Sequence, residues 1–301
     1  MLAVLAPGQG AQRPGFLQEW LAVPAFAASL RTLARDADVD LVSAGTELPE
    51  ERITDTAVAQ PLIVGAGLAA FGCLDLDPAT FVVAGHSVGE FTAAAAAGMI
   101  TAADAMRLIR VRGAAMAQAS SALPSGMAAV LGGEEHEVLA AIAAAGCDAA
   151  NFNGAGQIVA AGPAEAVARL LAAPPAGSRV RPLPVAGAFH TRLMAQARDA
   201  LAAAAARTEA AAAVGRGALS NLDGALLTSG RQVIDRLVEQ VCLPVRWDAC
   251  LATMSELGVT AVIELPPAGT LTALVRRALP GVETLALRTP EDLLAARELA
   301  A

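Results

Sequence analysis

The sequence predicts an α/β protein with a mostly parallel sheet and an inserted ferredoxin-like subdomain. Short apolar runs of strand length alternate with helical patterns in the first part of the chain. From Ser125 to Val185 the order becomes β-α-β-β-α-β, which is the pattern of a ferredoxin-like unit. After Val185 the alternation of short strands and helices resumes. We therefore expect an α/β catalytic domain of residues 1–124 and 186–301, interrupted by a subdomain of residues 125–185.

The parent domain is predicted from apolar periodicity and from turn residues. We expect strands at 2–6, 81–84, 259–265 and 282–287, and helices at about 16–34, 57–72 and 102–120. The alanine tract at 199–214 contains Arg207 and Glu209 and is predicted to form a water-soluble helix. In the insert we expect strands at 127–132, 148–152, 156–162 and 178–185, with helices at 134–146 and 164–172.

Composition excludes several classes of protein. The formal net charge of −8 argues against a general nucleic-acid surface. No apolar run approaches the roughly 20 residues that span a bilayer, and the N-terminus lacks the basic region of a signal peptide. We therefore expect a cytoplasmic protein that does not bind membranes. Nothing demands more than a monomer.

Cysteine, histidine and lysine usage narrows the chemistry. The four cysteines lack C-x-x-C spacing and fit reduced thiols, and only three histidines occur, far apart, so no metal site is expected. Every basic residue is arginine. The absence of lysine excludes Schiff-base catalysis and a Walker-type phosphate loop.

The stretch VVAGHSVGE suggests a nucleophile. It joins a short buried strand to a helix start through Gly-x-Ser-x-Gly, the context of a nucleophile elbow. Gly85 and Gly89 have no Cβ atoms to clash in so tight a turn, and Ser87 at its tip would hold its hydroxyl above the following helix. The alternative is an ordinary glycine-rich connection.

A serine hydroxyl needs a base within hydrogen-bond reach. His86 adjoins Ser87, where neighbouring side chains diverge, and we assign it a supporting role in the substrate-binding region. His136 lies in an acidic helix start and is expected to be solvated. His190 lies where the chain returns from the insert, so we assign it as the base, with a helix-capping histidine as the alternative.

No carboxylate stands out as the partner of the histidine. The acids between Ser87 and His190, where an elbow hydrolase usually places its acid, lie in helix starts or turns that explain them without catalysis. The sequence therefore suggests a Ser-His dyad whose imidazole is held by something other than a carboxylate.

One arginine falls on an apolar helix face. That face consists of Ala105, Leu108, Ile109, Arg112 and Met116. A buried guanidinium needs an anion or several carbonyls as partners, and its planar fork suits a carboxylate. We favour a substrate carboxylate for Arg112, with an internal ion pair as the alternative.

The N-terminal PGQGAQ contains G-x-G, but its third glycine is misplaced for a dinucleotide fingerprint and no acidic residue follows at the right interval. A glutamine on such a loop can instead direct an amide at a developing oxyanion, alongside the backbone N–H that follows the nucleophile. We expect Gln9 and Val88 to fill these roles.

Taken together, the motifs resemble those of the malonyl-CoA:acyl carrier protein transacylases, the acyltransferases of fatty-acid and polyketide synthesis, and especially their stand-alone actinobacterial members. The resemblance covers nearly the whole chain and lies in six segments in the same order: PGQGAQ, GHSVGE, RLIRVRG, NFNGAGQIVAAG, GAFHTRLM and VEQVCLPVRW.

The resemblance implies a hydrolase-like α/β core, with the active site between core and insert. It implies Ser87 as nucleophile, His190 as base and Arg112 as the clamp for the malonyl carboxylate. Gln9 and the Val88 amide would form the oxyanion hole. Gln240 belongs to the segment whose backbone carbonyl orients the histidine, which accounts for the missing acid.

The implied reaction is ping-pong transfer of malonyl from malonyl-CoA to the phosphopantetheine thiol of acyl carrier protein. No cofactor is expected beyond these substrates. Phe189 matches the malonyl-type motif and is expected to disfavour methylmalonyl. We expect Arg181, Arg192 and Arg246 to form a docking patch for the carrier. A serine esterase or thioesterase and a non-catalytic docking module remain as alternatives.

Overall fold

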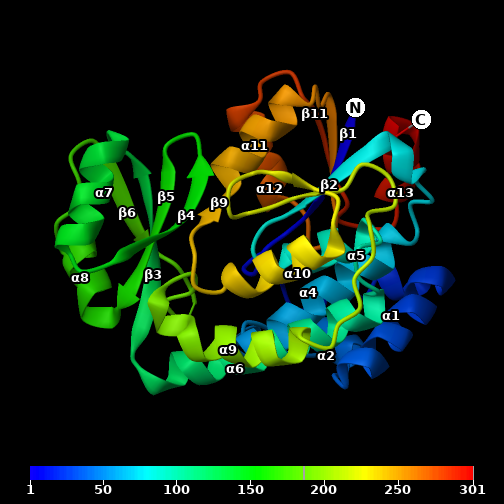
Figure 1. The fold of residues 1–301 in the computed structure, drawn as a ribbon, viewed down its shortest axis with the longest axis horizontal. Helices are drawn as coiled ribbons and strands as arrows, with labels where there is room; N and C mark the ends of the chain where they lie inside the picture. The colour runs from blue at the N-terminus through cyan, green and yellow to red at the C-terminus, as the bar shows by residue number, and fades with distance from the viewer. Residues whose placement is uncertain (186, 301) are drawn as a thin grey trace.

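The computed structural model, which describes residues 1–185 and 187–300, has an α/β architecture with two sheets (Figure 1). The larger sheet has the strand order β11-β10-β1-β2-β7-β8, and the smaller has the order β6-β3-β5-β4-β9. The expected fold class, a mostly parallel α/β core with a smaller subdomain, is confirmed.

The larger sheet is parallel from β11 to β7, and β8 pairs antiparallel to β7. Its strands are β1 (Leu2–Ala6), β2 (Phe81–Gly85), β7 (Ala218–Leu219), β8 (Leu226–Leu227), β10 (Ala261–Glu264) and β11 (Glu283–Ala286). The four strands expected in this domain all form. They end at the same edge, which is where the elbow begins.

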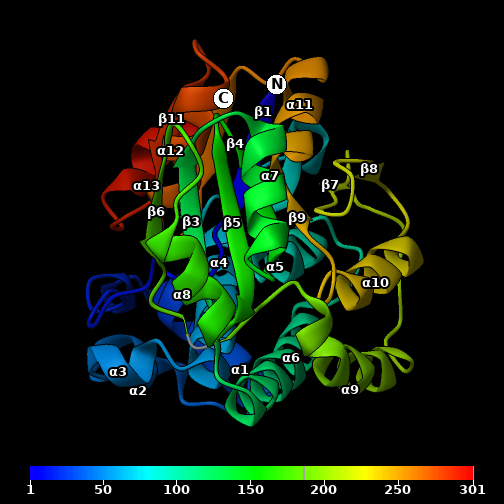
Figure 2. The ribbon, with the colours of Figure 1, turned by 90° about the vertical axis from the view of Figure 1, so that its left-hand side faces the viewer.

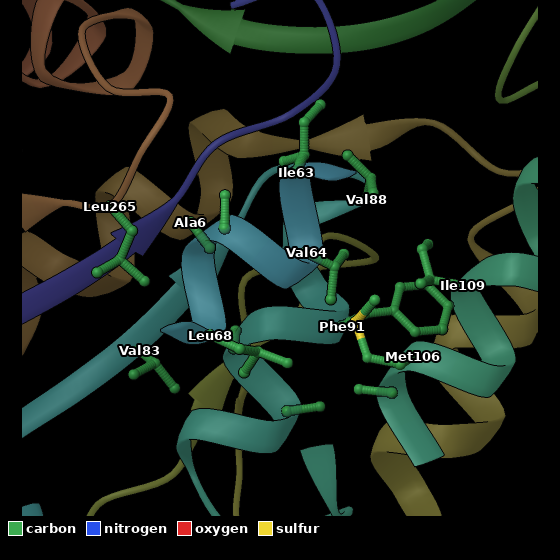
Figure 3. Close-up of a cluster of buried hydrophobic side chains, with 14 of the residues drawn as sticks. Ala6, Ile63, Val64, Leu68, Val83, Val88, Phe91, Met106, Ile109 and Leu265 are labelled. Carbon is green, nitrogen blue, oxygen red and sulfur yellow. The ribbon is translucent and has the colours of Figure 1, made fainter. Parts of the chain in front are cut away.

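Side chains alternate across this sheet and feed two separate hydrophobic clusters, because successive residues of a strand face opposite sides. Leu2 and Val4 of β1 pack on the side of α1, α4, α5 and α6, whereas Ala3 and Leu5 pack against α11 and α12. Figure 3 shows the first cluster beneath the elbow, including Val83, Val88 and Phe91. The elbow is therefore supported by close-packed apolar side chains.

Most helices cover the first face, and α11 and α12 cover the second. No helix in the described part of the chain is long and apolar enough to cross a bilayer. The helices of the larger domain are α1 (Pro24–Ala37), α2 (Leu41–Thr46), α3 (Glu50–Ile53), α4 (Thr56–Phe71), α5 (Gly89–Ala96), α6 (Ala102–Ala122), α9 (Ala195–Ala205), α10 (Gly230–Glu239), α11 (Trp247–Glu256), α12 (Thr270–Ala278) and α13 (Asp292–Ala300), with the 3-10 helices η1 (Trp20–Ala22), η2 (Pro78–Thr80) and η3 (Arg192–Met194).

Two helix predictions were partly wrong. The helix expected from Phe16 begins only at Pro24, because a proline without an N–H fits the first position of a helix and not its interior. The alanine tract is helical only to Ala205. Its second alanine run instead bonds to neighbouring segments, with the Ala211 N–H donating to the Met99 carbonyl and the Ala213 N–H to the Thr228 carbonyl. Tertiary hydrogen bonds here override the helix propensity of alanine.

The smaller sheet forms most of the subdomain that faces the viewer in Figure 2. Helices α7 and α8 cover one face, and the other face, with Met127 and Val159, joins the core cluster of the larger domain. Its elements are β3 (Ser125–Gly132), α7 (Glu135–Ala144), β4 (Asp148–Gly154), β5 (Gln157–Pro163), α8 (Ala164–Ala172) and β6 (Ser178–Pro182). The predicted β-α-β-β-α-β order forms.

A fifth strand of the smaller sheet comes from outside the insert. Strand β9 (Val245–Arg246) pairs parallel to β4, with Asn151 opposite Val245. It is too short to leave a strand pattern in the sequence. The subdomain is therefore tied to the parent domain by sheet hydrogen bonds as well as by the two chain crossings.

Candidate active site

Ser87 lies at the tip of a sharp turn between β2 and α5. Its backbone has φ of 53°, the left-handed region that residues other than glycine rarely adopt. The flanking glycines permit this turn by their small size. A Cβ on Gly85 would lie 2.0 Å from the Gly89 carbonyl carbon, and a Cβ on Gly89 would lie 2.1 Å from the Ala6 oxygen. This is the geometry of a nucleophile elbow.

His190 faces this serine from the segment that follows the subdomain. Its Nε2 lies 2.7 Å from Ser87 Oγ, and its Nδ1 lies 2.8 Å from the backbone oxygen of Gln240. A carbonyl oxygen only accepts, so Nδ1 carries the proton and Nε2 presents a lone pair to the hydroxyl. The structure thus brings together Ser87, His190 and Gln240, and a carbonyl takes the place that an acid occupies in a triad.

Burial and the nearby Arg112 charge lower the pKa of His190 to about 3. The desolvation of a buried imidazolium is the larger cause. The imidazole is therefore neutral near pH 7, which is the form that accepts a proton from the serine.

Arg112 projects from α6 into the same site and is fully buried. Its Nη2 donates to Ser87 Oγ at 3.2 Å and to Gln240 Oε1 at 2.7 Å, and its guanidinium carbon lies 5.8 Å from the centre of the Phe91 ring. Burial lowers its pKa to about 10, which leaves it charged near pH 7. Its Nε and Nη1 are buried without a hydrogen-bond partner among the described residues.

Two site residues escaped the sequence analysis. Asn221 accepts the Ser87 N–H through Oδ1 at 2.7 Å and donates to the Gly85 oxygen through Nδ2 at 2.7 Å, so it clamps both sides of the elbow. Glu90, in the first turn of the elbow helix α5, accepts hydrogen bonds from Asn221 and Gln240. The sequence holds one signal for Asn221, which is the polar pair Ser220-Asn221 directly after β7. The carboxyl ends of parallel strands meet at one edge of a sheet, so polar residues that follow β7 lie near the elbow that follows β2.

The Gln9 side chain does not point to Ser87, which corrects the expectation of a side-chain amide there. Its Nε2 lies 3.3 Å from both the Thr54 oxygen and Thr56 Oγ1, so these contacts draw it to the α3–α4 connection. The backbone N–H groups of Gln9 and Val88 make no hydrogen bond within the described residues. Both backbone N–H groups are therefore free to donate to a bound substrate.

The subdomain contributes neutral polar groups opposite the elbow. His86 Nε2 lies 2.9 Å from Asn153 Oδ1, and burial lowers the pKa of His86. A cleft of about 400 Å³ runs between the subdomain and the core, and its lining includes Gln9, His86, Asn153 and Gln157. Phe189, beside His190, is buried at 7% exposure. The cleft thus lies at the junction where the site was expected.

The three arginines expected to form a docking patch are exposed but lie on separate segments. Arg181 is on β6 and Arg246 on β9, at opposite edges of the smaller sheet. Arg246 also pairs with Asp248 and lies 5.0 Å from the Phe152 ring centre. With Arg192 on η3, these residues do not form one compact patch.

An elbow serine, a neutral histidine and a buried arginine on an α/β core define a serine-dependent acyl-transfer enzyme. The sequence model of the acyl transferase domain matches residues 4–289. The malonyl CoA-acyl carrier protein transacylase of Mycobacterium tuberculosis H37Rv is 50% identical over 297 residues, covering 97% of this chain and 98% of the relative. The chain therefore belongs to the family of malonyl CoA-acyl carrier protein transacylases.

Solved structures agree with this assignment. The crystal structure of the M. tuberculosis enzyme, at 50% identity, superposes with a TM-score of 0.95 and covers 99% of each chain. A malonyl-transacylase in complex with its type II polyketide acyl-carrier protein is 29% identical, with a TM-score of 0.91 and 99% coverage of each chain. The resemblance noted in the sequence, including that to actinobacterial members, is confirmed.

Proposed function

We propose that this enzyme transfers the malonyl group of malonyl-CoA to the phosphopantetheine thiol of an acyl carrier protein through an ester on Ser87. The observation that carries the proposal is that two N–H groups of Arg112 have no hydrogen-bond partner among the described residues. Two buried N–H groups without partners lie on a guanidinium that already touches Ser87 Oγ. A buried cationic fork of this kind suits a carboxylate held next to the reacting carbonyl.

In the first half-reaction, Ser87 Oγ attacks the thioester carbonyl carbon and its proton passes to His190 Nε2. The oxyanion would be held by the backbone N–H groups of Val88 and Gln9, which stand free beside the elbow. The C–S bond then breaks, and the coenzyme A thiolate takes the proton from His190. The Gln240 carbonyl keeps the imidazole in the required tautomer throughout.

The second half-reaction runs the same steps in reverse with a different thiol. The carrier thiol gives its proton to His190 and attacks the ester carbonyl, and the C–O bond to Ser87 breaks as the serine recovers the proton. One thioester replaces another, so the chemistry is close to balanced. The enzyme's task is to favour a thiol over water, and the burial of His190 and Arg112 supports that preference.

Selection of the acyl group would depend on Arg112 and Phe189. The guanidinium favours acyl chains that end in a carboxylate, because without one its buried N–H groups stay unsatisfied. Phe189 is packed beside the base, and its bulk would disfavour an α-methyl branch. We therefore propose malonyl as the preferred group over both acetyl and methylmalonyl.

The further attributes of the enzyme follow from the same site. Ser87, His190, Arg112 and Gln240 all come from one chain, which supports action as a monomer. The reaction needs no resident metal or cofactor, because coenzyme A arrives as part of the donor and phosphopantetheine as part of the carrier. Four free cysteines in the described structure fit a reducing compartment, so we propose a cytoplasmic enzyme.

The test is an incubation with malonyl-CoA radiolabelled in the malonyl group, with and without holo acyl carrier protein. Wild type should retain label, pass it to the carrier and release it only slowly to water, and Ser87→Ala should retain none. Arg112→Ala should lower malonyl labelling by about 100-fold or more, which corresponds to roughly 3 kcal/mol for a lost buried charge pair. Methylmalonyl-CoA should compete poorly.

Two outcomes would favour the other candidates. Fast release of free malonate despite available carrier would indicate a thioesterase or esterase, which shares the elbow and the histidine. No label on wild type would indicate a non-catalytic docking module.

A further inference from the structure

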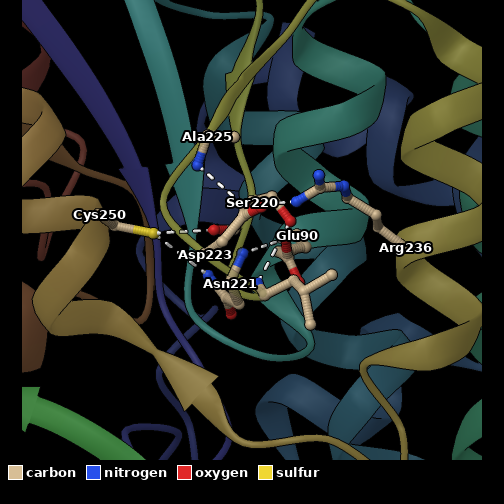
Figure 4. Close-up of polar contacts among 8 residues, drawn as sticks. Glu90, Ser220, Asn221, Asp223, Ala225, Arg236 and Cys250 are labelled. Atoms are coloured by element: carbon tan, nitrogen blue, oxygen red, sulfur yellow. Dashed lines mark hydrogen bonds and ion pairs between the residues drawn. The ribbon is translucent and has the colours of Figure 1, made fainter.

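Glu90 is a buried carboxylate that the proposed acyl transfer does not use directly. It lies in the first turn of α5 and is 7% exposed. Burial raises the pKa of Glu90 to about 7. Hydrogen bonds from Asn221 and Gln240 and the charges of Arg112 and Arg236 lower this pKa, but burial has the larger effect. Figure 4 shows it among Asn221, Ser220 and Arg236. A carboxylate in such a place is costly, so its contacts indicate its role.

Both oxygens of Glu90 accept hydrogen bonds from residues of the site. Oε1 accepts the backbone N–H of Asn221 at 2.8 Å, and Oε2 accepts the side-chain Nε2 of Gln240 in a short contact. Asn221 in turn accepts the Ser87 N–H. Glu90 therefore contacts the two residues that hold the elbow and the guanidinium.

The Gln240 amide lies between the carboxylate and the guanidinium. Its Nε2 donates to Glu90 and, at 2.9 Å, to the Ser87 carbonyl, while its Oε1 accepts from Arg112 Nη2 at 2.7 Å. Every polar atom of this amide is satisfied in one orientation only. If the amide were flipped, its NH₂ would face the donors of Arg112 and its oxygen would face two acceptors.

This arrangement leaves part of the guanidinium free. A carboxylate in direct contact would pair with the fork of Arg112 in bidentate fashion and compete with a substrate acid. With the amide interposed, Arg112 is held through Nη2 alone, and its Nε and Nη1 remain unpartnered among the described residues. The backbone oxygen of the same Gln240 orients His190.

We propose that Glu90 is a positioning residue that fixes the amide orientation of Gln240 and thereby holds Arg112 for the carboxylate of the acyl donor. This inference rests on the proposed function. It predicts that replacing one carboxylate oxygen of Glu90 with an NH₂ group alters recognition of the substrate carboxylate. The side chains of Gln240 and Arg112 lie between Glu90 and that carboxylate.

The substitution Glu90→Gln tests this with almost no change in shape. The Asn221 N–H requires an oxygen at the Oε1 position, so the new NH₂ faces Gln240 Nε2, donor against donor. The Gln240 amide relieves that conflict only by turning, which sets its NH₂ against Arg112. The double variant with Gln240→Met has no amide to turn and therefore no conflict.

We expect Glu90→Gln to lower kcat/KM for malonyl-CoA by about tenfold or more, mostly through KM, and that for acetyl-CoA by less than about threefold. In the Gln240→Met background, the same exchange should cost less than about twofold. Glu264→Gln is the matched control. Glu264 is also a buried carboxylate, and it accepts the N–H groups of Leu271 and Thr272 at 2.9 and 2.8 Å. It should lose stability but keep the preference for malonyl.

Equal losses for both donors, or an undiminished cost of Glu90→Gln in the Gln240→Met background, would overturn the inference. If Glu90→Gln alone does not fold but the double variant folds and acts like Gln240→Met, the coupling is established. If neither folds, the carboxylate serves the fold itself and the inference fails. If the wild type transfers no malonyl, the proposed function fails. If the wild type prefers malonyl and the Glu90→Gln variant keeps that preference, only the inference fails.

Discussion

The core and the subdomain differ in the polar groups that they contribute near the elbow. The core holds Glu90, Arg112 and His190, three titratable side chains that are each nine-tenths or more buried. The subdomain presents the neutral amides of Asn151, Asn153 and Gln157 to the cleft. Buried charge needs fixed partners, and the core supplies them through the elbow, Asn221 and Gln240. The comparison suggests that the core performs the chemistry and that the subdomain shapes the access to it.

The largest expected effect comes from a methyl group at the elbow. In Gly89→Ala the new Cβ would lie 2.1 Å from the Ala6 oxygen, so β1 and α5 must separate, at a cost of at least about 3 kcal/mol and with loss of Ser87 labelling. Gly126→Ala in β3 of the subdomain is the control, because its Cβ would meet no atom within 4 Å. Its free energy of unfolding should change by less than about 1 kcal/mol. Denaturant unfolding measures both, and equal losses would contradict the contrast between the core and the subdomain.

An intermediate effect is expected in the pH dependence of stability. The folded pKa of Glu90 is raised to about 7, so its contribution is fully present below the unfolded pKa of 4.5 and is lost as pH rises through 7. His190, whose folded pKa is lowered to about 3, contributes stability that is lost as pH falls below 6.5. Subtracting the Glu90→Gln variant from wild type cancels the His190 contribution.

The stability advantage of wild type over Glu90→Gln should therefore shrink between pH 4.5 and 7.5, by a few kcal/mol at most, on the order of 1.4 kcal/mol for each unit of pKa shift. Thermal unfolding across this range measures it. A difference that stays constant or grows with pH would show that Glu90 is ionised more readily in the fold than its burial indicates.

The smallest effect on stability and activity is expected from a substitution in the subdomain. Asn153→Ala removes the 2.9 Å contact with His86 and leaves a half-buried ring nitrogen without its partner, at a cost of about 1 kcal/mol. We expect kcat/KM for malonyl-CoA to fall by less than about tenfold, with the preference over acetyl-CoA unchanged. A loss as large as that of Arg112→Ala would place essential chemistry on the subdomain.

Local pattern was sufficient for several parts of the fold. Strand β1, the strand that leads into the elbow and helix α8 were predicted closely, since periodicity and glycine spacing act within a few residues. The burial of Arg112 followed from helical spacing alone, because residues three and four apart share one face.

By itself, then, the sequence determined the fold class, the elbow and the candidate side chains Ser87, His190 and Arg112. Only the tertiary structure decided their partners. Ser87 and His190 are 103 residues apart, and Glu90 and Gln240 are 150 apart. The direction of the Gln9 side chain, the extended second alanine run and the pairing of β9 likewise depend on groups that are distant in the chain. Propensity and spacing act over one or two turns, whereas a buried polar group is satisfied by whichever partner the packing of the whole chain brings to it.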